Sequence, residues 1–221
     1  AWDHTQPRLH FDLAAEPVVM DGRLFVPSSR HEGLSAYDSV TGKALWHFDA
    51  EGPVRFAPVA WEDKVYFISD DGFLYCVAAR TGKLLWKRNG GPTERWVLGN
   101  HRLVSSWPAR GGPVLKEGII YFAASIWPFM GIFIHAVDAD TGKVIWTNSG
   151  DGTNYTVHPH GAPSFASVVP QGHLALSGDA LIISGGRSTP AVYNLKDGSL
   201  RHFVYDKRRG DHVVMAGPDA Y

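Results

Sequence analysis

The sequence predicts an all-β fold built from repeated antiparallel units, and three observations support this. Gly and Pro are plentiful, at 24 and 14 of the 221 residues, as a turn-rich chain requires. No stretch shows a long helical periodicity. Two short patterns recur in the same order along the chain, and a recurring unit has to be interpreted as a repeat before any single residue is given a role.

The first pattern is a tight turn between two strands, at residues 37–46, 79–86, 138–146 and, in a degenerate form, 194–202. An acidic side chain at its start can bond the backbone a few residues on. A Gly then supplies the positive φ that such a turn often needs, and an apolar pair ending in Trp resumes a strand. The defining residues are Asp38, Gly42, Trp46, Gly82, Trp86, Asp138, Gly142 and Trp146.

The second pattern lies upstream of each turn and predicts a β-hairpin with an acidic or Gly-containing turn, at 17–26, 58–67, 113–122 and 174–183. Joined to the later hairpin, each unit has four strands, A to D. Four-stranded antiparallel units repeated at this length are typical of the blades of a β-propeller. We therefore expect one propeller domain over 1–221, with blades at about 16–50, 56–90, 111–150 and 172–205 and the start of a fifth at 211–221.

The repeats resemble those of the PQQ-like (quinoprotein-type) β-propeller family, whose signature is Ala-x-Asp-x-x-Thr-Gly-Lys-x-x-Trp. Residues 36–46 and 136–146 match it fully, whereas the second copy departs at Cys76 and Ala78. The resemblance implies that each motif Trp packs between neighbouring blades. It also implies a ring of seven or eight blades, of which this chain is a part, completed by further blades of the same chain or by a partner protein. An exported or periplasmic bacterial location is implied by the resemblance alone.

Composition narrows the classes of partner. The net charge of −1 argues against nucleic-acid binding or binding to an anionic membrane by bulk charge. No apolar run is long enough to span a membrane. The single cysteine, Cys76, excludes an internal disulfide framework and a zinc site built from cysteines. The chain starts at Ala1 rather than Met, so we expect that its N-terminus was processed or cut.

Antiparallel topology places the A–B and C–D turns on one face of the propeller, and the B–C loops and D-to-A connections on the other. The second face receives every long insertion, mainly at 88–111, 124–131 and 148–172. Because functional residues concentrate in loops held by a rigid scaffold, we expect a ligand there. The candidate ligand-binding residues on this face are Arg55, Arg110, Trp107, Trp127, Arg187 and His160.

Arg55 and Arg110 each stand three residues before the strand-A proline of their blade, so both should reach the mouth of the central channel. Arg suits carboxylates and planar anions. The alternative is a structural role, capping loop carbonyls or pairing with Glu51 or Glu94. The loop from Trp127 to Met130 is apolar, and we expect it to pack under the 88–111 connection rather than to stack on a sugar or another ring.

The pair His158 and His160 has the only spacing typical of metal ligands. Residues two apart in an extended segment project the same way, so both imidazoles can share a copper or zinc ion. Further ligands are not assured, although Asp151, His101 and His135 are available. The alternative is that both are loop histidines bonded to backbone.

Three functions compete. The first is a non-catalytic module that binds or scaffolds protein or glycan, and we favour it. The second, implied by the resemblance, is a quinoprotein dehydrogenase that holds PQQ on Ca²⁺. Against it, such enzymes often carry a vicinal Cys pair over the quinone, and this sequence has one Cys. The third is a metal site at His158 and His160. The same repeats serve several functions, so the fold alone does not decide among them.

Overall fold

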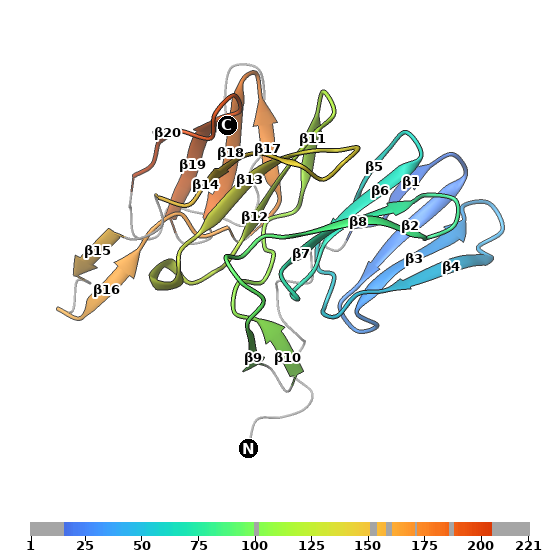
Figure 1. Cartoon of the computed structure of the whole chain (residues 1–221), viewed down its shortest axis with the longest axis horizontal. Helices are drawn as coiled ribbons and strands as arrows, with labels where there is room; N and C mark the ends of the chain where they lie inside the picture. Colours follow the sequence, from blue (N-terminus) through green and yellow to red (C-terminus); the bar gives the residue numbers. More distant parts are fainter. Residues whose placement is uncertain are drawn as a thin grey trace.

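The fold of the chain, seen in a computed structural model, is all-β with four antiparallel sheets of four strands each (Figure 1). The structure describes residues 16–99, 102–150, 154–157, 161–170, 172–185 and 188–204. Within each sheet the strands follow in sequence order, which is the up-and-down arrangement of a propeller blade. The expected fifth blade at 211–221 lies outside the described residues. The grouping into one propeller domain and its blade boundaries stay predictions.

Every sheet runs from strand A to strand D in chain order. The first contains β1 (Val18–Met20), β2 (Arg23–Ser28), β3 (Gly33–Asp38) and β4 (Ala44–Asp49). The second contains β5 (Val59–Trp61), β6 (Lys64–Ile68), β7 (Phe73–Ala78) and β8 (Leu84–Asn89). The third contains β11 (Val114–Lys116), β12 (Ile119–Ala124), β13 (Phe133–Asp138) and β14 (Val144–Asn148). The fourth contains β17 (Leu174–Ser177), β18 (Ala180–Gly185), β19 (Ser188–Asn194) and β20 (Leu200–His202).

The turn between strands C and D is built by its own side chains. In the first blade Asp38 Oδ1 accepts hydrogen bonds from the backbone N–H and the hydroxyl of Thr41, at 2.7 and 2.8 Å. These bonds, the backbone bond first, lower the pKa of the Asp38 carboxyl. Gly42 closes the turn at φ +71° and donates to the carbonyl of Asp38. The second blade has Ala78 at the Asp position, and there the Thr81 N–H bonds the Ala78 carbonyl instead.

The core consists of three apolar layers, one between each pair of neighbouring sheets. Phe25 and Leu34 of the first blade are buried with Val65 and Phe67 of the second. The second and third blades, and the third and fourth, enclose equivalent layers. Cys76 lies in the layer between the second and third blades and is fully buried, as expected of a small core residue, and burial raises the pKa of its thiol to about 12.

The motif tryptophans join each blade to the next. The indole N–H of Trp46 donates to the carbonyl of Ala79 at 3.0 Å, and that of Trp86 donates to the carbonyl of Ala139 at 3.2 Å. Trp146 reaches the carbonyl of Leu195 in the fourth blade at 2.9 Å. The indole also covers the motif Gly of the following blade, where no side chain fits. A Cβ at Gly82 would lie 2.7 Å from the Trp46 ring, which is closer than real Cβ contacts.

The insertions leave the blades from loops on one side. The connection from the second to the third blade forms a hairpin, β9 (Trp96–Gly99) and β10 (Arg102–Ser105). The B–C loop of the third blade contains the short 3-10 helix η2 (Pro128–Met130). The connection to the fourth blade contains β15 (Asn154–Val157) and β16 (Pro163–Ala166). In Figure 1 both hairpins project from the lower edge of the sheets. In the described part of the chain no helix has both the length and the apolar character needed to cross a membrane.

Candidate functional site

Arg55 and Arg110 meet at one buried carboxylate on the insertion side, that of Asp70. Arg55 Nε donates to Asp70 Oδ2 at 2.7 Å. Arg110 engages both oxygens, with Nη2 3.0 Å from Oδ2 and Nε 2.8 Å from Oδ1. The Asp70 side chain is 3% exposed, Arg55 8% and Arg110 18%. Both arginines therefore share one internal partner, the Asp70 carboxylate.

Asp70 belongs to the tight B–C loop of the second blade. Hydrogen bonds join this loop to the connections before and after the blade. The Asp70 N–H donates to the carbonyl of Pro53, and the Asp70 carbonyl accepts from the N–H of Ser105. The Ser69 hydroxyl donates to the carbonyl of Gly52, and the Ser69 carbonyl accepts from the N–H of Ala109. The connections on either side of the second blade are thus both fixed to this loop.

The neighbouring Asp71 is a second buried carboxyl with a different set of partners. It accepts hydrogen bonds from the Tyr75 hydroxyl at 2.5 Å and from the N–H groups of Phe73 and Glu51 at 2.9 and 3.1 Å. Burial raises the pKa of Asp71, and these hydrogen bonds oppose the rise. Burial also raises the pKa of the Tyr75 phenol. The group is satisfied internally and presents no open coordination position.

The aromatic candidates divide into one buried and one exposed group. Trp107 is 8% exposed, and its indole N–H donates to the carbonyl of Met130 at 2.9 Å, so it supports the η2 loop. Trp127 and Phe129 are 49% and 60% exposed, with ring centroids 5.9 Å apart. Trp107, in the 88–111 connection, bonds the backbone of this loop, but the rings of Trp127 and Phe129 remain about half exposed instead of packing under that connection.

Most of the remaining candidates fall in the part of the chain that the structure does not describe. Arg187, His158 and His160 lie outside the described residues, as do His101 and Asp151. His135 is described, and each of its ring nitrogens already has a hydrogen-bond partner. Its Nε2 lies 2.9 Å from the carbonyl of Gly90 and its Nδ1 lies 2.9 Å from the hydroxyl of Thr147. Among the described residues no group of three or more His, Cys, Asp or Glu side chains is placed to hold a metal ion.

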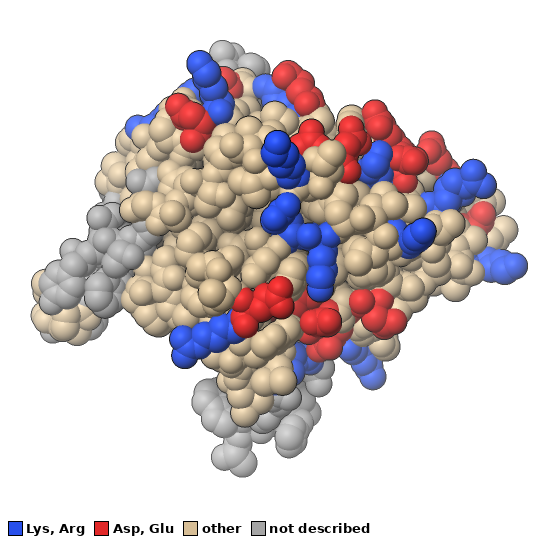
Figure 2. Space-filling model, viewed as in Figure 1, with Lys and Arg blue, Asp and Glu red and all other residues tan. Residues whose placement is uncertain are grey.

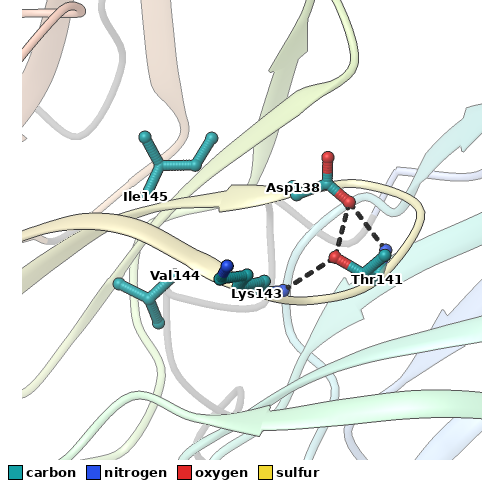
Figure 3. Close-up of a pocket in the computed structure, with 5 residues that line it drawn as sticks. All are labelled: Asp138, Thr141, Lys143, Val144 and Ile145. Carbon is teal, nitrogen blue, oxygen red and sulfur yellow. Dashed lines mark hydrogen bonds between the residues drawn. The ribbon is translucent and has the colours of Figure 1, made fainter.

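A shallow depression in the third blade is formed by the repeat itself (Figure 3). Asp138, Thr141 and Lys143 line it together with Val144 and Ile145. Figure 3 shows Asp138 already bonded to Thr141 and the Lys143 backbone bonded to the Thr141 hydroxyl. Asp138 Oδ1 and the Thr141 hydroxyl are therefore already engaged in holding the turn.

An apolar patch on the β9–β10 hairpin is exposed to solvent, and the sequence did not predict it. Leu98 and Leu103 are 79% and 61% exposed, and Trp96 is 37% exposed. Aliphatic residues in a long connection give no signal of exposure, because their orientation depends on the hairpin register. The signal that was available is two short apolar runs, Trp96–Leu98 and Leu103–Val104, on either side of a short segment that contains Gly99.

Comparisons with known proteins agree with the fold and with the repeats. Residues 1–105 match the family model described as "Outer membrane protein assembly factor BamB". The dehydrogenase subunit of a quinone alcohol dehydrogenase from Gluconacetobacter polyoxogenes is 36% identical over 143 residues, which are 59% of this chain and 19% of that protein. The chain thus spans about a fifth of the length of this relative.

Two solved structures resemble the chain at low identity and support the fold alone. A quinohemoprotein alcohol dehydrogenase from Pseudomonas putida aligns with a TM-score of 0.64 at 18% identity, covering 89% of this chain and 34% of the other. BamB from Moraxella catarrhalis aligns with a TM-score of 0.52 at 18% identity, covering 89% and 62%. The family-model match and the sequence similarity thus support the resemblance to PQQ-like β-propeller repeats, and the solved structures support the propeller fold.

We predict that Arg55→Ala destabilises the fold. It leaves the buried Asp70 carboxylate with a weaker set of partners, and removing one member of a buried ion pair costs about 3 kcal/mol. Urea denaturation followed by tryptophan fluorescence measures the free energy of unfolding. Arg80→Ala, an exposed turn residue, is the matched control and should change stability by less than about 0.5 kcal/mol. Equal stability of the two variants would show that the Asp70 cluster does not hold the connections.

We also predict that His135 makes stability fall in acid. Burial lowers the pKa of its imidazole from 6.5 to about 4, so the unfolded chain takes up the proton first. The contribution of neutral His135 is complete above pH 6.5 and is lost as the pH falls toward 4. The loss reaches about 1.4 kcal/mol per pH unit. Urea midpoints across this range, compared with those of His135→Gln, isolate the effect, and parallel curves for the two proteins would contradict it.

Proposed function

We propose that this chain is a non-catalytic part of a PQQ-like propeller, and that it binds or scaffolds a protein on its insertion face. The observation that carries the proposal is the Arg55–Asp70–Arg110 cluster. The two cations best suited to an anionic ligand at the inner rim are neutralised in part by a buried carboxylate and hold the loops together. The same face presents Leu98, Leu103 and Phe129, each more than half exposed.

A quinone with carboxylate groups is a poor fit to these arginines. Binding its carboxylates would require Arg55 or Arg110 to give up Asp70, and a buried carboxylate without a cation is costly. For this reason we derive no redox step for the described residues. An exported or periplasmic location accompanies the proposal on the resemblance alone.

The second candidate is a quinone-dependent alcohol dehydrogenase, and the relatives favour it. The similarity at 36% identity is to the dehydrogenase subunit of such an enzyme, although it covers only 19% of that protein. In this case the quinone site would be formed with residues outside the described part of the chain.

A further blade, from the same chain or from a partner protein, completes the ring in our proposal. At each joint the indole N–H bonds the carbonyl that directly follows the motif Asp position, as at Ala79 and Ala139. The equivalent carbonyl in the first blade is that of Ser39. Among the described residues a Cβ added at the nearby Gly42 would have no atom within 4 Å, so none of them takes the place that the indole of a preceding blade would occupy. The fourth blade carries His202 at the Trp position and does not supply one.

A titration with PQQ tests the function. We expect no saturable quenching of tryptophan fluorescence by PQQ, with or without Ca²⁺, in the longest natural protein that contains this chain. The physical reason is that Asp70 already occupies the arginines at the inner rim. Saturable, Ca²⁺-dependent binding with a Kd of about 1 μM or tighter would reject the proposal in favour of the dehydrogenase.

Three glycine substitutions in the same protein test completion of the ring. Gly42, Gly22 and Gly142 all have positive φ, at +71°, +73° and +66°, so alanine costs each about 1–2 kcal/mol of backbone strain. Of these three glycines, only Gly142 is covered by an indole of the described chain: a Cβ added there would lie 2.6 Å from the Trp86 ring. If a blade covers Gly42, Gly42→Ala should lower the unfolding midpoint as much as Gly142→Ala. If the unfolding midpoint of Gly42→Ala equals that of Gly22→Ala, no indole covers Gly42 and the proposed completion of the ring at this blade is refuted.

A further inference from the structure

The register of the β9–β10 hairpin determines which backbone groups point outward. The Ser106 N–H donates to the Arg95 carbonyl at 2.7 Å, just beyond the last strand pair, Trp96 with Ser105. Hydrogen-bonded and non-bonded pairs alternate in an antiparallel ladder, so Trp96 and Ser105 form a non-bonded pair, as do Leu98 and Leu103. The N–H and C=O groups of Trp96 and Leu98 therefore point away from β10.

The two edges of this hairpin have different surroundings. The outward N–H of Ser105 on β10 donates to the carbonyl of Asp70, so the β10 edge faces the body of the propeller. The other edge, at Trp96 and Leu98, belongs to β9. In the part of the chain that the structure describes, β9 pairs with β10 alone and no strand lies along its outer edge.

The face of the hairpin next to this edge is apolar and uncharged. Leu98 and Leu103 lie opposite each other on one face, 79% and 61% exposed, and Trp96 is on the same side of β9. The charged residue within the two strands, Arg102, bonds Glu32 and the carbonyl of Ser29 in the first blade. In Figure 2 charged side chains line the upper edge of the molecule, away from the place that the β9–β10 hairpin takes in Figure 1.

The hairpin is also held rigidly. Its end is bonded to the Asp70 loop through Ser105, and Arg102 ties its tip region to the loop of the first blade. Edge strands of natural proteins usually carry a Lys, a Pro or a bulge that prevents another strand from pairing with them. Residues 96–99 carry none of these, and their ladder with β10 is regular. A strand edge that is fixed in place and has no charge, proline or bulge is suited to strand addition by an extended peptide.

We propose that the outer edge of β9 is a docking site for an extended, uncharged peptide segment of a partner protein. The segment adds a third strand through main-chain hydrogen bonds to Trp96 and Leu98. Its alternate apolar side chains cover Leu98, Leu103 and Trp96. This inference rests on the proposed binding function and names the chemistry of the partner: an apolar strand whose lack of charge matches that of the hairpin.

The test uses fluorescence anisotropy with the intact protein and a labelled peptide, acetyl-Ser-Val-Thr-Val-Thr-Val-Ser-amide. Leu98→Pro removes the outward N–H, which is tolerated at an edge because that N–H takes no part in the β9–β10 ladder. We expect it to weaken binding about tenfold relative to Leu98→Ala, which removes the same apolar contact but keeps the donor. The same peptide with alternate N-methylated residues should bind neither variant nor the parent protein. Circular dichroism checks that both variants fold.

Each outcome decides the proposal. Saturable 1:1 binding with the expected order of variants supports it. Equal binding by Leu98→Pro and Leu98→Ala, binding of the N-methylated peptide, or no binding at all overturns it. Dimers of the protein that dissociate in Leu98→Pro, without peptide binding, would assign the edge to a second copy and also overturn it. The PQQ titration is independent of these outcomes, so failure of the docking site and failure of the non-catalytic function are distinguishable.

Discussion

The contact between a motif indole and the glycine of the following blade is the constraint on which the remaining architecture depends. The sheet of a blade has two apolar faces. It is stable only when a neighbouring sheet covers each of them. The indole of Trp86 fixes the spacing because its N–H bonds the carbonyl of Ala139 while its ring lies over Gly142. One hydrogen bond and one steric requirement thus set the register of two sheets. Further polar contacts join the same two blades: the buried Tyr66 hydroxyl donates to the Ala139 carbonyl at 3.1 Å, and Arg88 Nε donates to the Gly142 carbonyl at 2.9 Å.

The insertion side obeys a different constraint, which is the burial of charge. Asp70 is placed where backbone groups from three segments converge, and its carboxylate needs cations at hand. Arg55 and Arg110 come from the connections on either side of the second blade, so their pairing with Asp70 fixes both connections at once. The long 88–111 connection can consequently project a hairpin without becoming loose at its base.

The sequence was sufficient to predict the all-β propeller fold with its four-stranded antiparallel sheets, because the evidence is local. The Asp38 turn and the Gly42 φ are decided within a few residues, and their recurrence identifies the repeat. The partner of Arg55 could not be predicted, because Asp70 is fifteen residues away and the fold alone brings the two together. Glu51 was nearer in sequence, but its backbone N–H bonds Asp71.

The exposure of the β9–β10 hairpin likewise could not be predicted from the sequence. Leu98 and Leu103 look ordinary in the sequence, and their exposure follows only from the register that Ser106 and Arg95 establish. Hydrophobic side chains on a surface loop usually collapse onto the nearest core. Here the two ends of the hairpin are bonded to different blades, so collapse would break the contacts of Ser105 with Asp70 and of Arg102 with Glu32. The apolar face remains outside because the polar contacts hold it there, which is the arrangement expected of a surface that a partner covers.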